Sequence, residues 1–167
     1  MRRDINTDVV RRSCHLQAAQ GWLELGNHLE ANEELENITP QFRSHPAVLE
    51  LRWRIYAKAE NWIACVDIGM ALTKLAPESA VSWLHLAYAL HELKRTQEAF
   101  DVLLPVATKF PADATVRYNL ACHTCQPGDL VAARDWLAQA IRLGDQKEIR
   151  LQAIEDPDLA PLWRETE

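Results

Sequence analysis

The sequence has little glycine, five in 167 residues, and contains none of the short motifs that mark common catalytic sites. There is no glycine-rich phosphate loop, no His-Glu-x-x-His pair and no Gly-x-Ser-x-Gly elbow. No apolar stretch approaches the ~20 residues that are needed to span a bilayer. The sequence therefore predicts no catalytic residue, no metal, no cofactor and no membrane as a partner.

Positive charge is not in excess. Lysine and arginine total 18 against 24 acidic residues, which gives a formal net charge of −6. Nucleic-acid binders usually carry a basic excess or stripe, so this balance argues against a nucleic-acid partner. The arginines near the start are interleaved with aspartates and indicate a solvated start of the chain rather than a nucleic-acid site: Arg2, Arg3, Arg11 and Arg12, with Asp4 and Asp8.

Cysteine is sparse, with four in the chain. The N-terminal arginines are not followed by an apolar run, so we expect no secretory signal. Cysteines at this density, without such a signal, indicate reduced thiols and a cytoplasmic location. Composition does not predict an oligomeric state.

What the sequence does contain is a repeat. Alanine or cysteine recurs every 34 residues, at Ala31, Cys65, Ala99 and Ala133. Helix-capping residues follow the same interval at Asn27, Asn61 and Asp129, each just before a helical apolar pattern. A period of about 34 residues is typical of stacked helix–turn–helix units, which bury their apolar faces only against their neighbours.

The caps and the prolines divide the chain into helix pairs. We predict an all-α fold, a right-handed α-solenoid of about four units that forms a single domain over residues 1–167. The expected helix pairs are 8–25 with 28–41, 46–59 with 62–75, 80–93 with 97–110, and 114–125 with 130–143. The corresponding repeats are about 12–45, 46–79, 80–113 and 114–145. In the third repeat Thr96 is expected to be the helix cap, because Arg95 occupies the capping position of the 34-residue interval.

The segment after the fourth repeat, 146–167, is predicted to be a C-terminal cap. Asp145 and Glu148 predict the start of one more helix, and Asp156-Pro157 predicts its end. The apolar residues that we expect to cover the last repeat are Ile149, Leu151, Ile154, Leu159, Leu162 and Trp163.

The third repeat resembles a tetratricopeptide repeat, with that family's tryptophan, leucine, small-residue, alanine and proline positions occupied by Trp83, Leu86, Ala87, Ala99 and Pro111. The fourth is similar at Leu120, Ala121, Ala133 and Ala140. Segment 118–163 is similar to the end of small bacterial tetratricopeptide proteins of unassigned role. The resemblance covers about residues 12–145 and implies a protein-binding function.

In that family the first helix of each pair lines a concave groove. Carried onto this chain, the resemblance implies a partner-binding groove formed by Leu16, Gln20, Leu23, Glu50, Arg54, Lys58, Leu84, Tyr88, His91, Tyr118, Asn119 and Cys122. The alternative is that some of these residues pack against the terminal helices. The implied function is a scaffold or adaptor that holds a peptide or helix of a protein partner. A secretion-type or assembly chaperone is a second interpretation.

The motif Cys122-His-Thr-Cys125 leaves one other alternative open. Cys122 and Cys125 are three residues apart, so their thiols can share one face of a helix. His91 precedes Cys125 by 34 residues and therefore occupies the equivalent position of the preceding repeat. A metal- or redox-responsive protein would use these groups. A second Cys-x-x-Cys is missing and the motif ends a helix, where no dipole lowers a thiol pKa. We therefore expect small packing residues and no metal.

Overall fold

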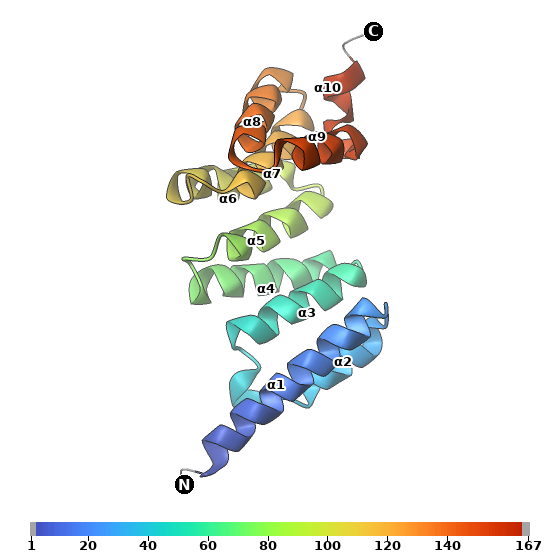
Figure 1. The fold of residues 1–167 in the computed structure, drawn as a ribbon, viewed down its shortest axis with the longest axis vertical. Coiled ribbons are helices and arrows are strands. Elements are labelled where there is room, and N and C mark those ends of the chain that lie inside the picture. Colours follow the sequence, from blue (N-terminus) through green and yellow to red (C-terminus); the bar gives the residue numbers. More distant parts are fainter. Residues whose placement is uncertain (1–2, 165–167) are drawn as a thin grey trace. The chain divides into compact units, whose positions relative to one another are not determined.

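The structure is a computed structural model that describes the backbone of residues 3–164 and the side chains of residues 7–164. Within that range the chain forms ten α-helices, two short 3₁₀ turns and no strand, which confirms the all-α prediction. The helices, in chain order, are α1 (Arg3–Glu24), α2 (His28–Glu36), α3 (Pro46–Lys58), α4 (Trp62–Leu75), α5 (Ala80–Glu92), α6 (Thr96–Lys109), α7 (Ala114–Cys125), α8 (Leu130–Leu143), α9 (Gln146–Glu155) and α10 (Ala160–Arg164) (Figure 1). The 3₁₀ turns are η1 (Pro40–Phe42) and η2 (Pro157–Leu159). No helix of this part is both long enough and apolar enough to cross a membrane.

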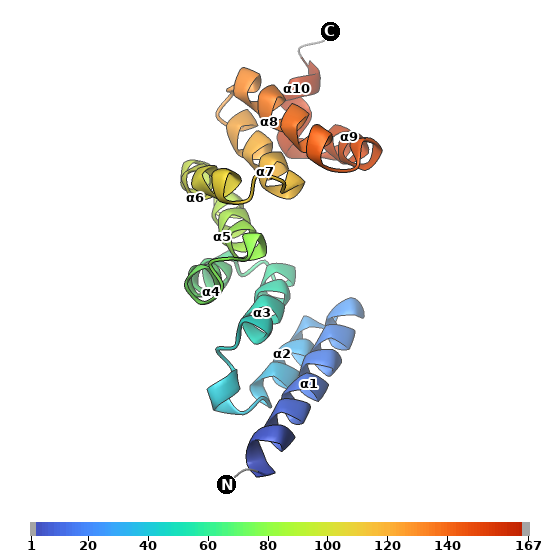
Figure 2. The same cartoon turned by 60° about the vertical axis from the view of Figure 1, so that its left-hand side comes forward.

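The chain forms two compact units, Met1–Pro77 and Glu78–Glu167. In the first unit α1 packs against α2 and α3 against α4, and in the second α5 packs against α6 and α7 against α8 (Figures 1 and 2). Each of these four contacts joins the helices that the sequence pairs. The right hand of the solenoid and the number of repeats stay predictions.

Every first helix of a pair ends in the same way. Residues 26, 60, 94 and 128 are spaced by 34, and each has a positive φ, of 81°, 55°, 62° and 92° respectively. In each case this residue donates its N–H to the carbonyl three residues back, and the next residue donates to the carbonyl five residues before itself. This is a Schellman motif, which favours glycine because glycine has no Cβ to clash. Only Gly26 and Gly128 meet that preference, since Glu60 and Lys94 occupy the other two positions.

We expect Lys94→Gly to stabilise the chain by about 0.5–1 kcal/mol, because it removes the cost of a left-handed non-glycine residue. Chemical unfolding of the full chain measures the change. Lys74→Gly is the matched control, since Lys74 is exposed in the last turn of α4 and does not have a positive φ, so glycine there should not stabilise the chain. A Lys94→Gly variant that unfolds more easily than the wild type would contradict the expectation.

The helix starts follow the capping residues of the sequence. The side chains of Asn27, Asn61, Asp129 and Asp145 each accept a hydrogen bond from the N–H three residues later, at 3.2, 3.3, 3.0 and 2.9 Å. The prediction for Thr96 is wrong. Arg95 is the capping residue of α6, and its side chain forms no cap bond because a guanidinium has no acceptor atom; it is instead paired with Glu98 at 2.7 Å.

Two helix boundaries in the first repeat differ from the prediction. The first helix begins at Arg3 rather than near residue 8, while Arg2 lies outside the described residues. The second ends at Glu36 rather than 41. Pro40 accounts for this early end, because proline has no N–H to donate and disfavours helical geometry in the residue before it.

The 34-residue interval of small residues is a packing requirement. Ala31, Cys65, Ala99 and Ala133 are all completely buried. Each lies on the second helix of a pair, where a larger side chain would hold the neighbouring helix away. The small residues at this spacing therefore belong to the core rather than to a binding surface.

The segment after α8 packs on the second unit, but not through all the residues that we expected. Ala153, Leu159 and Leu162 are buried in one apolar cluster with residues of α7 and α8, and Ile149 packs against that cluster. The prediction for Leu151 and Ile154 is wrong, because they are 53% and 65% exposed. Residues 149 and 153 share one face of α9, whereas 151 and 154 lie on the face turned to solvent.

Candidate functional site

In the first unit, the predicted groove residues lie on α1 and α3, which contact one another. The guanidinium of Arg54 donates a hydrogen bond to the side-chain oxygen of Gln20 at 2.7 Å. These two residues are 34 positions apart, so the bond joins equivalent faces of consecutive repeats. Leu16 and Leu23 are half-buried against the apolar core of this unit.

The exposed part of this face is polar and basic. Arg54 and Lys58 are exposed near the end of α3, and Glu50 is half-buried one turn before Arg54. The first unit therefore presents positively charged groups above a half-buried apolar base. Such a surface can hold the backbone or an acidic side chain of an extended peptide.

In the second unit, the predicted groove residues lie on α5 and α7, which also contact one another. Tyr88 is 42% exposed, and Leu84 and Asn119 are half-buried. By contrast His91, Tyr118 and Cys122 are only 6–7% exposed. The three buried residues are covered by the segment that follows α9.

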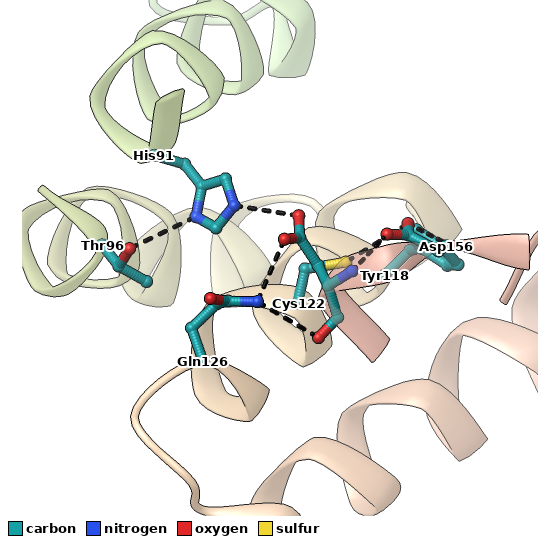
Figure 3. Close-up of polar contacts among 7 residues, drawn as sticks. His91, Thr96, Tyr118, Cys122, Gln126 and Asp156 are labelled. Carbon is teal, nitrogen blue, oxygen red and sulfur yellow. Dashed lines mark hydrogen bonds and ion pairs between the residues drawn. The ribbon is translucent and has the colours of Figure 1, made fainter. Parts of the chain in front are cut away.

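Two aspartates of that segment make the covering contact (Figure 3). Asp156 accepts hydrogen bonds from the Tyr118 hydroxyl at 2.7 Å and from the Cys122 thiol at 3.8 Å. Asp158 pairs with Nε2 of His91 at 2.9 Å. The second oxygen of Asp158 accepts a hydrogen bond from the Gln126 side chain at 3.0 Å. We call these two residues the tail aspartates.

The local backbone holds the tail aspartates in place. Asp156 is the capping residue of η2, and its Oδ1 accepts the N–H of Asp158 at 2.9 Å. Pro157 follows the cap at the first position of the turn, where its missing N–H has no structural cost. Leu159 is then fully buried, which anchors the turn in the core.

Beside the tail aspartates lies a pocket of about 230 Å³, which we call the acidic pocket. Its lining includes Tyr88, Tyr118, Asn119, Gln152, Asp156 and Asp158. They come from α5, α7, α9 and the turn after α9. The pocket is therefore built jointly by the predicted groove and by the tail.

Burial and the carboxylates keep the neighbouring groups protonated. Burial, followed by the hydrogen bond to Asp156, raises the pKa of Tyr118 above its ordinary value. Burial, followed by the charges of Asp156 and Asp158, raises the pKa of the Cys122 thiol. Both groups are therefore hydrogen-bond donors at neutral pH, and Cys122 is not a reactive thiolate.

The structure does not group the soft ligands as the metal alternative requires. Cys125 is 1% exposed in the apolar cluster of the second unit, and His91 faces Asp158. A different set lies close together, since potential ligand atoms of Cys122, Asp156 and Asp158 lie within 4.8 Å of one another. The carboxylates in this set already accept hydrogen bonds from Tyr118, Cys122 and His91.

Sequence reasoning missed the tail aspartates and Gln152 as parts of the site. The only local signal was Asp156-Pro157, which predicts a helix end and says nothing of a partner across the fold. Their contacts join residues 38 and 67 positions apart in the chain. The 34-residue interval does not relate the tail aspartates to Tyr118 and His91, because the tail lies outside the repeats.

Comparison of the fold with solved structures finds tetratricopeptide proteins. Neither a protein-family model nor a curated protein sequence matches the chain. The structure is similar to that of residues 41 to the end of MamA from Desulfovibrio magneticus RS-1, with a TM-score of 0.71 and 18% identity over 93% of this chain and 91% of that one. It is also similar to TTC0263, a thermophilic tetratricopeptide protein of Thermus thermophilus, with a TM-score of 0.75 and 20% identity over 93% and 82%.

A larger assembly contains the same fold. In the structure of the Cut9–Hcn1 hetero-tetramer of APC/C, the similarity covers 92% of this chain and 29% of that one, at 19% identity and a TM-score of 0.69. These identities establish the fold alone. The predicted resemblance to the tetratricopeptide fold is confirmed.

Proposed function

We propose that this chain is a protein-interaction module that holds an extended peptide or a helix of a protein partner against the first helices of its repeats. The observation that carries the proposal is the exposure of Arg54 and Lys58 on α3 and of Tyr88 on α5, each the first helix of its pair. The apolar cores of the two units do not require these exposed groups. Arginine and tyrosine are the residue types that contribute most to binding energy in protein interfaces.

The fold supports this proposal in general terms. A solenoid of helix pairs presents a long surface made of repeated positions, and such surfaces are commonly used for binding. The proposal has no catalytic step, since neither a nucleophile–base pair nor a paired acid and base stands out in the sequence. The partner in this proposal is a protein, and the cytoplasm is the compartment that suits four reduced cysteines.

Substitution on the proposed face tests the function. After a partner has been isolated with the full chain as bait, Arg54→Glu and Tyr88→Ala should each weaken its binding by about 2 kcal/mol or more, roughly 30-fold, as central interface residues do. Isothermal titration calorimetry measures the affinity, and circular dichroism confirms that the helix content is unchanged.

Two matched substitutions serve as controls on the second helices. Arg142→Glu makes the same charge change on α8, and Leu104→Ala removes a side chain of α6 that is 42% exposed, the same fraction as Tyr88. Neither should alter the affinity. A partner that is insensitive to Arg54→Glu and Tyr88→Ala but sensitive to the controls would place the binding surface on the second helices.

A further inference from the structure

The acidic pocket has an unbalanced charge. Asp156 and Asp158 both line it, and its lining contains neither lysine nor arginine among the described residues. Glu92 adds a third carboxylate nearby, since its charge and those of the tail aspartates act on Tyr88. On the facing helix α5, Nε2 of His91 pairs with Asp158.

The tail aspartates retain capacity to bind a further donor. An ionised carboxylate offers about four acceptor positions. The side chain of Asp158 accepts one bond from His91 and one from Gln126, and it is 33% exposed. Asp158 also lines the pocket, so a cation that enters the pocket can reach this carboxylate without displacing the protein's own donors.

The rest of the pocket suits the stem and head of a long basic side chain. Tyr88 and Tyr118 supply aromatic rings, which attract a cation placed over their faces. Asn119 and Gln152 supply amide oxygens that accept hydrogen bonds from an ammonium or guanidinium group. A volume of about 230 Å³ is smaller than the roughly 300–1,000 Å³ of pockets for drug-sized ligands, and is suited to a single side chain.

A divalent metal fits the same residues less well. A thiol binds a metal as the thiolate, yet the Cys122 thiol is protonated and donates to Asp156. A metal held by Cys122, Asp156 and Asp158 would have to expel that proton and would compete with the bonds from Tyr118 and His91. A basic side chain requires neither change.

We propose that the acidic pocket receives a lysine or arginine side chain of the bound partner, so that the second unit selects a segment with a basic residue. This inference rests on the proposed function and specifies the chemistry of the partner. The tail then has two roles, because it closes the apolar core through Leu159 and supplies the acidic side of the recognition pocket.

Small amides of single amino acids test the pocket directly on the full chain. We would titrate Nα-acetyl-arginine amide, Nα-acetyl-lysine amide and the neutral Nα-acetyl-glutamine amide, and follow the side-chain amide signals of Asn119 and Gln152 by NMR. The two basic compounds should give saturable shifts that weaken as salt is raised. Equal shifts with the glutamine compound would overturn the proposal.

Substitutions within the pocket sharpen the test. Asp158→Asn keeps the shape of the side chain and removes its charge, so binding of the arginine compound should weaken at least tenfold. Asp135→Asn removes one charge from an exposed position of α8 and should leave binding unchanged. Tyr88→Leu removes a ring without altering the tail, and should weaken binding at least threefold even if Asp158→Asn impairs folding.

A zinc titration separates the metal alternative. Stoichiometric zinc binding that blocks the arginine compound and is lost in Cys122→Ser would replace our proposal with a metal site. The proposed interaction function is tested separately by Arg54→Glu, because Arg54 lies in the first unit and outside the acidic pocket. A partner that is weakened by Arg54→Glu but contains no required basic residue would leave the interaction module in place and overturn the assignment of this pocket.

Discussion

Leu159→Ala should lower the free energy of unfolding by about 2–5 kcal/mol, the usual cost when a buried leucine is shortened and leaves a cavity. Leu159 is completely buried and Leu162 is 2% exposed, both in the cluster formed with α7 and α8. Leu162→Ala should therefore have a similar effect. Urea unfolding of the full chain, followed by circular dichroism, measures both changes.

Two leucine-sized residues of α9 provide the control. Leu151 and Ile154 are 53% and 65% exposed, so their replacement by alanine should change the stability by no more than about 0.5 kcal/mol. If Leu159→Ala were as stable as the wild type, the tail would not close the core. If Leu151→Ala cost as much as Leu159→Ala, α9 would pack through its other face.

The residues of α9 show why this face could not be predicted. Its sequence places Ile149 and Ala153 four positions apart on one face, and Leu151 and Ile154 three positions apart on another. Both spacings are typical of a buried helix stripe, and a helix of ten residues is too short for periodicity to separate them. The larger side chains of Leu151 and Ile154 led to the prediction of the wrong face, because the face that is buried carries the small residue Ala153.

The parts of the fold that were predicted correctly depend on local chemistry. The capping bonds of Asn27, Asn61, Asp129 and Asp145 each span three residues, so the residue type alone places the helix start. Arg95 shows the limit of this reasoning, since the repeat geometry places the helix start at a residue that cannot cap it. At the start of α6, the position of the residue within the repeat therefore decided where the helix begins, and the preference of residue types for capping did not.

The candidate site could be predicted only in part. The 34-residue interval places Gln20 and Arg54 at equivalent positions of neighbouring repeats, whereas the hydrogen bond between them was not predicted. The tail aspartates have no such relation to Tyr118 and His91, and they reach these residues only because Leu159 is anchored in the core. A contact that depends on how the tail folds back cannot be predicted from periodicity or from local motifs.

His123 should make the chain less stable as the pH falls below about 6.5. It is 2% exposed on α7, its Nδ1 has no hydrogen-bond partner within the described residues, and its ring lies 5.0 Å from that of His91. Burial, followed by the charge of His91, lowers the pKa of His123 from 6.5 to about 3. Between these two values the unfolded chain binds a proton that the folded chain excludes.

The sign and size of the effect follow from this difference in proton binding. Stability falls as the pH decreases wherever the unfolded state binds more protons, by up to about 1.4 kcal/mol per pH unit for one group. Between about pH 6.5 and about pH 4.5 the contribution of His123 is therefore roughly 2–3 kcal/mol. Well above about pH 6.5 the residue is neutral in both states and contributes no pH dependence.

Unfolding of the wild type and of His123→Leu at about pH 7.0 and about pH 4.5 isolates this contribution. His91 and Asp158 remain in both proteins, so the difference between the two pH dependences is assigned to position 123. The variant should lose roughly 2–3 kcal/mol less than the wild type on acidification. Parallel losses for the wild type and His123→Leu would mean that His123 is protonated in the folded chain, and that the space around its ring admits the charge.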